Sequence, residues 1–269
     1  MKRLAPIVFA LAVFFSFNAT SVFGQLGQCA VPIGPLRPDL IVDGHFLRSM
    51  MSVREETYSP GSCAVVEGCI TAPGTHLVLR FMSSTPNIGQ TDLFIGDPRQ
   101  CLDGLFHFSE CHQHLHFDEY ADYRLWTVAG YQKWVASRDM TKPTNTGKNA
   151  KLLADARANG ELIVGRKQGF CIIDVQPFQF GNVEPGPPLY QSCGTNQGLK
   201  VGWADQYHPL LDCQFIQVTG VREGDYVLED HVNPEHLFPE SDFTNNASAV
   251  KIHFKPKQGR SGPSVEILD

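Results

Sequence analysis

The amino-acid sequence predicts a mainly β fold, an antiparallel, β-sandwich-like single domain with long loops, little helix and stabilising disulfides. Short apolar or alternating segments, rich in β-branched and aromatic residues, recur between turn residues, which is typical of antiparallel all-β proteins. One segment alone has a helical pattern, and the chain contains eight cysteines. With 269 residues, 42% of them hydrophobic, the chain can bury a substantial core.

The N-terminal 24 residues, "MKRLAPIVFALAVFFSFNATSVFG", have the pattern of a secretory signal peptide: two early cations, a long apolar stretch and small residues near the end. An uncleaved membrane anchor is the alternative. No later segment approaches the roughly 20 apolar residues of a membrane span, so we expect a secreted, extracellular protein. Loss of Lys2 and Arg3 would change the formal net charge from −6 to −8. An acidic surface favours cationic partners and gives no support to nucleic-acid binding.

The remaining chain divides by composition into a Gly- and Pro-rich irregular leader at 25–37, a main domain at 38–256 and a tail at 257–269. In the main domain, strand-like segments alternate with turn residues. They lie at 76–81, 114–120, 122–126, 213–221, 225–232 and 248–254. The turn "VREGD" at 221–225 predicts a hairpin between two of these segments.

The helical pattern lies in "NAKLLADARANGELIVG" at 149–165, where Ala and Leu are followed by a stop signal at Asn159 and Gly160. The preceding residues, 141–149, are polar and predict an exposed loop.

The cysteines indicate disulfides. An even number of cysteines in an exported chain makes disulfides the default, and no CxxC pair suggests a zinc ribbon. Cys111 directly precedes a histidine run. Because neighbouring side chains of a strand face opposite ways, Cys111 could anchor the back of that strand while the histidines work at its front.

Three of the ten histidines occur at alternate positions in "CHQHLHF". In a strand, His112, His114 and His116 would lie on one face at intervals of about 7 Å, close enough to converge if the strand bends. Neutral imidazole is a good ligand for copper, zinc, nickel and iron. Three separately hydrogen-bonded histidines, or a zinc hydrolase site with an open water position, remain alternatives.

Four segments of the sequence resemble successive landmarks of the catalytic domain of the lysyl oxidase family. The resemblance runs from about Pro38 to Phe254, in the order of the family. It rests on "PDLIVDGHF", "CHQHLHFDEY", "GRKQGFC" and "DQYHPLLDCQFIQVTGVREGDYVLEDHVNPEHLFPESDFTNN".

The resemblance implies a secreted, copper-dependent amine oxidase. His112, His114 and His116 would bind copper, and Lys167 and Tyr207 would combine into the cofactor lysine tyrosylquinone. Such a quinone supplies the electrophile that no ordinary side chain offers. A primary amine, above all peptidyl lysine, would become an aldehyde, with O2 consumed and H2O2 and NH3 released.

Asp205, two residues before Tyr207, is the candidate catalytic base by the same resemblance. A solvated loop carboxylate is the alternative, because a base must lie within hydrogen-bond reach of the substrate. The implied partners are an amine or lysine-containing protein and O2.

The segment "PESDFTNN" predicts a structural calcium site, because oxygen-bearing side chains suit a hard cation. The resemblance implies that it meets the start of the domain. An Asn-rich turn is the alternative. The expected ligands are Asp39, Leu40 through its carbonyl, Glu240, Asp242, Asn245 and Asn246.

The resemblance also implies disulfide pairings. Three follow the family, and a fourth joins the two cysteines outside its pattern; two free thiols are the alternative to that fourth bridge. The pairs are Cys63–Cys111, Cys69–Cys213, Cys171–Cys193 and Cys29–Cys101.

The sequence departs from the animal enzymes by an insertion between Trp126 and Gly165, at about 127–164, which could cap the site or form a partner surface. Its acidic charge also differs from their basic regions. Two other functions stay open: a non-catalytic copper-binding or interaction module on the same fold, and a zinc hydrolase that uses the three histidines.

Overall fold

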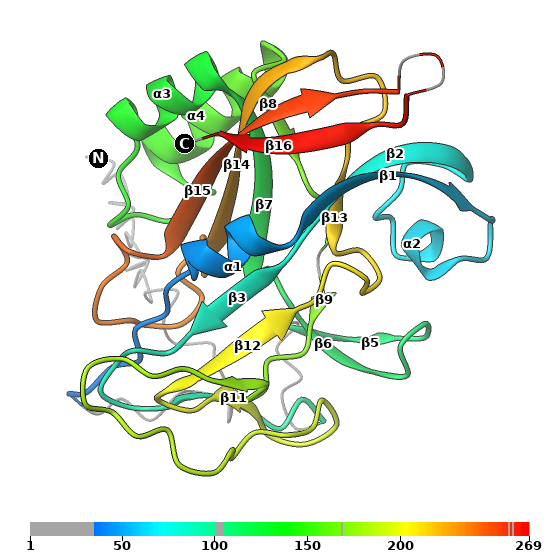
Figure 1. The fold of residues 1–269 in the computed structure, drawn as a ribbon. Helices are drawn as coiled ribbons and strands as arrows, with labels where there is room; N and C mark the ends of the chain where they lie inside the picture. Colours follow the sequence, from blue (N-terminus) through cyan, green and yellow to red (C-terminus); the bar gives the residue numbers. More distant parts are fainter. Residues whose placement is uncertain (1–34, 100–104, 168, 258, 260, 269) are drawn as a thin grey trace, which may run out of the picture.

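A computed structural model describes residues 35–269 apart from 100–104, 168, 258, 260 and 269 (Figure 1). The described chain is mainly β, with antiparallel strands in several sheets and little helix, which confirms the predicted fold class. No helix among the described residues is both long and apolar enough to cross a membrane. The predicted signal peptide, Cys29 and Cys101 lie outside the described residues.

The largest sheet is antiparallel and has five strands. In spatial order these are β16 (Ser264–Leu268), β15 (Ala247–Lys255), β14 (Gly224–Val232), β7 (Ala121–Thr127) and β8 (Leu162–Val164). Alternate residues of β7, β14 and β15 belong to the main hydrophobic core, including Leu125, Leu228 and Ile252, as the two-residue period of strands requires. The segment expected as a tail contributes β16, which pairs with β15.

Four smaller sheets complete the β structure. The first contains β1 (Met51–Tyr58), β2 (Gly74–Phe81) and β13 (Phe215–Gln217), and the second contains β10 (Gln176–Pro177), β12 (Trp203–Tyr207) and β3 (Ser83–Pro86). The third contains β5 (Phe106–Ser109), β6 (His114–Asp118) and β9 (Gly169–Phe170). The fourth pairs β11 (Gln197–Leu199) with β4 (Leu93–Gly96). Strands β6 and β12 carry four of the predicted site residues, His114, His116, Asp205 and Tyr207.

The helices are α1 (Gly44–Ser49), α2 (Cys63–Val66), α3 (Val128–Ser137) and α4 (Gly147–Ala158). The predicted helix at 149–165 is therefore α4, which ends before Asn159 as expected, while β8 occupies the last part of that range. Helix α3 was not predicted; it begins where the Thr127 side chain accepts a hydrogen bond from the Gly130 backbone. Both α3 and α4 belong to the insertion, and they contact β7, β14 and β8 at one end of the molecule (Figure 1).

The predicted hairpin at 221–225 is wrong. Strand β13 pairs with β2, and β14 pairs with β15 and β7, so this turn leads the chain from one sheet into another. The local turn signal was real, but burial decides the strand partners: Ile216 is fully buried in the main core.

Two of the implied disulfides are present, Cys69–Cys213 and Cys171–Cys193. The implied Cys63–Cys111 bridge does not hold in the structure, where both cysteines are thiols. The neighbouring Cys111 thiol, followed by burial, raises the pKa of the Cys63 thiol to about 11. The Cys63 sulfur also lies within 4.8 Å of ligand atoms of His112 and Asp212, so it is shared among several polar neighbours.

Candidate functional site

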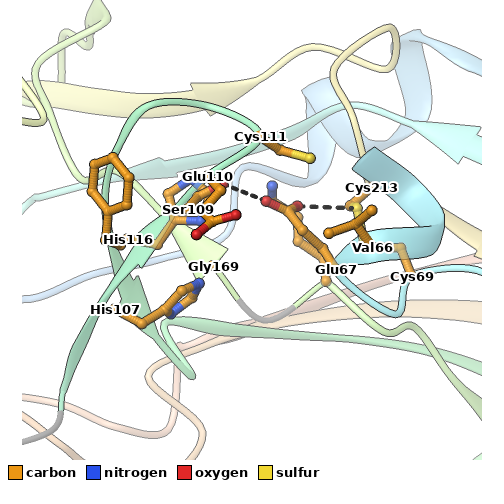
Figure 2. Close-up of a pocket in the computed structure, with 12 residues that line it drawn as sticks. Val66, Glu67, Cys69, His107, Ser109, Glu110, Cys111, His116, Gly169 and Cys213 are labelled. Atoms are coloured by element: carbon orange, nitrogen blue, oxygen red, sulfur yellow. Dashed lines mark hydrogen bonds between the residues drawn. A yellow bond between two sulfur atoms is a disulfide. The ribbon is translucent and has the colours of Figure 1, made fainter. Parts of the chain in front are cut away.

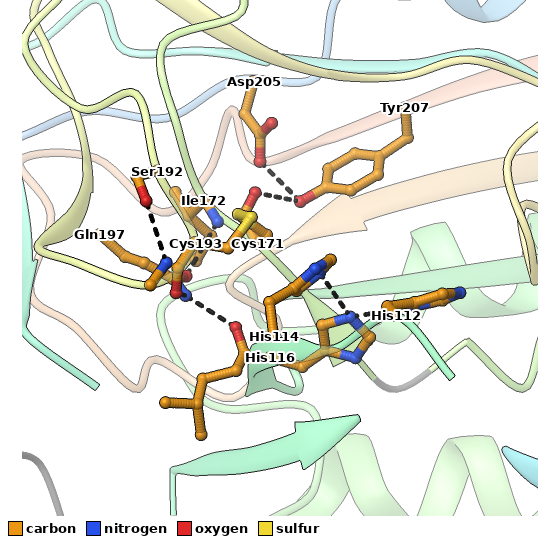
Figure 3. The surroundings of a disulfide bond; sticks show 12 residues. His112, His114, His116, Cys171, Ile172, Ser192, Cys193, Gln197, Asp205 and Tyr207 are labelled. Atoms are coloured by element: carbon orange, nitrogen blue, oxygen red, sulfur yellow. Dashed lines mark hydrogen bonds between the residues drawn. A yellow bond between two sulfur atoms is a disulfide. The ribbon is translucent and has the colours of Figure 1, made fainter. Parts of the chain in front are cut away.

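The three histidines of the run converge on one point (Figure 3). The Nε2 atom of His116 lies 3.1 Å from Nε2 of His114 and 3.2 Å from Nδ1 of His112. Metal–nitrogen bonds of about 2.0–2.1 Å place neighbouring ligand nitrogens about 3 Å apart. The geometry of the three nitrogens therefore fits a metal ion.

The alternate spacing predicted that the three histidines share one strand. In the structure they do not. Strand β6 begins at His114, and His112 lies in the preceding turn. Gln113 has a φ of 57°, a left-handed conformation that bulky residues rarely adopt. This bend folds the His112 ring back toward His116, which brings the nitrogens closer than the spacing of a regular strand allows.

Burial favours the neutral form of two histidines of the triad, His116 and His114. It lowers the pKa of His116 to about 3, with His114 as the next cause, and it lowers the pKa of His114, with His112 as the next cause. Neutral imidazoles keep the lone pairs that a metal ion needs.

Gly169 in β9 makes room for His116. A Cβ at this position would collide with Nδ1 of the His116 ring, so the sequence requires glycine beside the triad. Gly169 was not among the predicted site residues, and only its place in "GRKQGFC" could have indicated it. Gly169 and His116 also line a cavity of about 430 Å³, whose other lining residues include the polar groups Glu67 and Ser109 (Figure 2).

Lys167 and Tyr207 lie side by side, although 40 positions separate them in the sequence. The Lys167 Nζ atom is 5.2 Å from the centre of the Tyr207 ring and 5.0 Å from that of Phe170. Lys167 is 8% exposed, and burial lowers its pKa to about 8. A buried amine against a phenol ring is an unusual position for a lysine, which is almost never fully buried unless it is paired.

Asp205 and Tyr207 point the same way from β12, because they are two positions apart in a strand. The Tyr207 hydroxyl donates to Asp205 Oδ2 at 2.7 Å and lies 3.1 Å from the Cys171 carbonyl oxygen (Figure 3). Burial raises the pKa of the Asp205 carboxyl and of the Tyr207 hydroxyl well above their ordinary values. Asp205 is thus not the solvated loop carboxylate that was the alternative.

One cavity of about 460 Å³ joins these groups. Its lining includes the histidine triad, Lys167, Asp205 and Tyr207, together with an apolar part. The apolar lining residues are Ile173, Val175, Leu211 and the Cys171–Cys193 disulfide. A metal site, a buried amine and a phenol therefore open onto the same space.

A second polar cluster contains most of the residues expected to bind calcium. Glu240 accepts hydrogen bonds from the Leu40 backbone N–H and from Asn246, and Asp39 accepts one from Asn245 at 2.8 Å. The two segments thus meet across some 200 positions of sequence. Burial raises the pKa of Glu240 to about 8.

The Asp242 carboxylate is engaged within its own turn. It accepts from the backbone and hydroxyl of Thr244, which caps that turn. The side-chain oxygens of Asn245 and Asn246 are buried, and neither has a hydrogen-bond partner among the described residues.

Two carboxylates beside His112 were not found from the sequence. The Asp212 Oδ2 atom lies 3.4 Å from His112 Nε2, and the Glu67 Oε1 atom lies 3.6 Å from His112 Nδ1. Both flank the Cys69–Cys213 bridge in sequence, and no pattern of residue types marks them as neighbours of the triad.

The sequence of the chain is similar to those of known proteins. A family model described as lysyl oxidase matches residues 153–261. Lysyl oxidase homolog 1 from Homo sapiens is 30% identical over 227 residues, which cover 81% of this chain and 33% of that protein. The chain belongs to the lysyl oxidase family. Family membership agrees with the resemblance found in the four sequence segments.

The second relative is protein-lysine 6-oxidase from Gallus gallus, which is 27% identical over 227 residues, covering 81% of this chain and 45% of the relative. The chain therefore spans less than half the length of both relatives. Within the lysyl oxidase family, the similarity includes the region that forms the cavity.

Proposed function

We propose that this protein is a secreted, copper-dependent amine oxidase of the lysyl oxidase type. It converts primary amines, above all the side chain of peptidyl lysine, to aldehydes through lysine tyrosylquinone. The amine, O2 and water give the aldehyde, H2O2 and NH3. The observation that carries the proposal is the single cavity that joins the triad to Lys167 and Tyr207.

Copper fits the donor set of the triad. Three imidazole nitrogens are a donor set that suits copper. His112, His114 and His116 would hold the ion. When bound, copper supplies the redox chemistry with O2 that oxidises the phenol, and the Lys167–Tyr207 quinone is then the electrophile for the amine.

Lys167 is prepared to join the tyrosine ring. A pKa lowered to about 8 leaves a fraction of the amine neutral near neutral pH, and only the neutral amine is a nucleophile. Its Nζ already lies over the ring that it must attack. The Phe170 ring is the second aromatic neighbour of the Lys167 amine and helps to exclude water from it.

Asp205 holds the Tyr207 hydroxyl and is our candidate for the base that removes the α-proton of the substrate amine. Its hydrogen bond to the hydroxyl fixes the ring orientation, and its burial makes the ionised carboxylate more basic than one in water. The proton would rest on the Asp205 carboxyl.

The cavity suits an amine carried on an aliphatic chain. Ile173, Val175 and Leu211 offer apolar contact for the methylenes of a lysine side chain. The acidic balance of the chain would attract lysine-rich proteins.

Peptide mass spectrometry of copper-grown protein tests this function directly. We expect a cross-linked peptide that contains both Lys167 and Tyr207, and H2O2 release from a primary amine. Tyr207→Phe should abolish both signals, because it removes the phenol that is oxidised. Tyr190→Phe, at a buried tyrosine outside the cavity lining, should retain them.

The same experiment separates the other functions. Copper-loaded protein with Lys167 and Tyr207 only in unmodified peptides would reject the oxidase and favour a non-catalytic copper-binding module. Zinc-loaded protein that hydrolyses esters or peptides and consumes no O2 would favour the hydrolase.

The second polar cluster supports a structural calcium ion as a further part of this proposal. The buried, unpartnered oxygens of Asn245 and Asn246 and the carboxylates of Asp39 and Glu240 are ligands that calcium prefers. The Leu40 carbonyl and Asp242 would complete the set after the Asp242 carboxylate turns from Thr244. The ion would fasten the start of the domain to the segment after β14.

Calcium should raise the melting temperature of the protein, and a calcium chelator should lower it. Asn246→Ala should remove this calcium-dependent shift, whereas Asn145→Ala, in the insertion, should keep it. An equal melting temperature with calcium and with chelator would reject the calcium site and leave the oxidase proposal intact.

A further inference from the structure

His112 has polar neighbours at both ring nitrogens. Its Nδ1 atom faces His116 Nε2 at 3.2 Å, and its Nε2 atom faces Asp212 Oδ2 at 3.4 Å. An imidazole that binds a metal through one nitrogen carries its hydrogen on the other, and the hydrogen-bond partner of that hydrogen sets the tautomer.

We propose that Asp212 is a positioning residue for the metal ligand His112. Its carboxylate accepts the hydrogen of His112 Nε2, which leaves the lone pair of Nδ1 directed at the metal position. This inference rests on the proposed metal triad, and it assigns a role to a residue outside that triad.

His112 needs such a partner more than the other two histidines do. His114 and His116 are fixed by the ladder of β6 with β5, and the His116 ring also packs on Gly169. His112 lies outside β6, in the turn at Gln113. Its ring orientation therefore depends on groups that contact the ring itself.

The loop that carries Asp212 is firmly held. Arg80, which is 7% exposed, donates from one guanidinium nitrogen to the carbonyls of Pro209, at 2.7 Å, and Leu211, at 3.1 Å. A second guanidinium nitrogen of Arg80 pairs with Glu56 at 2.7 Å. The carboxylate thus projects from a loop whose backbone is fixed from behind.

The residue after Asp212 adds to this fixation. Cys213 is bonded to Cys69 and has a φ of 61°, a conformation that costs energy for a residue other than glycine. The disulfide next to Asp212 therefore fixes the backbone from which the carboxylate projects before any metal arrives. Ligands fixed in advance lose less entropy on binding.

Glu67 is a poorer candidate for the same role. It is nearest to Nδ1, the nitrogen that faces the other histidines, and it already accepts a hydrogen bond from the Ser109 hydroxyl. Asp212 is the carboxylate within hydrogen-bond distance of the outer nitrogen.

Metal titration of purified apo-protein tests the inference without any turnover. Asp212→Asn should weaken Cu(II) and Zn(II) binding by about 10- to 100-fold in competition with a chelator, as for other carboxylates that orient metal-bound histidines. Asp212→Glu should recover part of the loss. The ¹⁵N shifts of the Zn(II) form should place the His112 hydrogen on Nε2.

Asp118→Asn is the matched control. Asp118 pairs with His107 at 2.6 Å, and the His107 ring lies 5.3 Å from that of His116, yet His107 is outside the triad. Its substitution should leave metal affinity within about twofold of the wild type. Equal melting temperatures of the apo-forms would show that both variants fold.

Two results would overturn the inference. One is Asp212→Asn protein that binds the metal as tightly as the wild type while His112→Ala protein has lost it. The other is a thiolate-to-copper absorption band that Cys63→Ser removes, because the ion would then lie among Cys63, His112 and Asp212, whose ligand atoms are within 4.8 Å of one another, and Asp212 would be a ligand and not a positioning residue. If His112→Ala, His114→Ala and His116→Ala all retain metal binding, the proposed triad itself fails.

Discussion

Two neighbouring carboxylates on β14, Glu229 and Asp230, are both fully buried and have opposite surroundings. Glu229 faces the inserted helices and accepts from Trp126 Nε1 at 3.0 Å and Trp134 Nε1 at 3.1 Å. Arg138 adds an ion pair at 2.6 Å, and Arg124 lies 3.5 Å away. Asp230 faces the main core, and neither of its oxygens has a hydrogen-bond partner among the described residues.

The difference shows that the hydrogen bonds and ion pairs of Glu229 anchor the insertion, whereas the main core encloses the Asp230 carboxyl without such partners. Two indole donors and two guanidinium groups surround the Glu229 carboxylate, as a buried carboxylate requires. Burial raises the pKa of Asp230 to about 7, so this carboxyl keeps its proton in mildly acidic solution. Opposite faces of one strand thus place the same functional group in different surroundings, one with four partners and one with a raised pKa.

The largest expected effect is on the Glu229 side. Glu229→Gln removes the charge that pairs with Arg138 at 2.6 Å and lies 3.5 Å from the fully buried Arg124, and it places an amide against two indole donors. Breaking a buried pair in this way costs about 3–5 kcal/mol. We expect that loss in the free energy of unfolding, measured by urea denaturation.

Glu55→Gln provides the matched control, because Glu55 pairs with Lys257 at 3.1 Å on the surface. Surface pairs contribute below about 1 kcal/mol. Metal affinity of the folded Glu229→Gln protein should be unchanged, since the inserted helices contact β7, β8 and β14. A tenfold change in that affinity would show that the insertion and the metal site are coupled.

The sequence predicted the chemistry of the site better than its shape. The spacing of His112, His114 and His116 indicated a metal cluster, but the bend at Gln113 that closes it is a backbone conformation no residue pattern revealed. Lys167 and Tyr207 became candidates only through the resemblance. Their contact joins the segment before β9 to β12, a long-range pairing that local sequence does not encode.

The insertion shows the same limit. Its second helix was found from Ala and Leu with a stop at Asn159, whereas α3 contains Val128, Tyr131 and Trp134, residues equally at home in a strand. Trp134 is helical here because its indole reaches Glu229. The sequence presents Glu229 as one of three polar residues in a strand, and its partners Trp134 and Arg138 lie in a helix and its end about 90 positions away.

The smaller effect, and one of opposite sign, is on the Asp230 side. A carboxyl whose pKa rises from 3.8 in the unfolded chain to about 7 in the folded protein stabilises the fold below pH 4. That stability declines as the pH rises through 7, because the folded state must then bury an unpaired charge. We take the difference in free energy of unfolding between Asp230→Asn and the wild type at pH 5 as the reference. By pH 8.5 this difference should have changed in favour of Asp230→Asn by on the order of 2 kcal/mol.

Urea denaturation of both proteins at the two pH values measures this difference, and subtraction removes every other titrating group. Asp225→Asn, at an exposed position on the same strand, is the control. Hydrogen bonding to His253 lowers the pKa of Asp225, so its carboxylate stays ionised from pH 5 to 8.5 and its substitution should shift both values equally. If Asp230→Asn also shifts them equally, Asp230 is ionised throughout this range, an unseen cation or water compensates its charge, and the two faces of β14 are more alike than their contacts indicate.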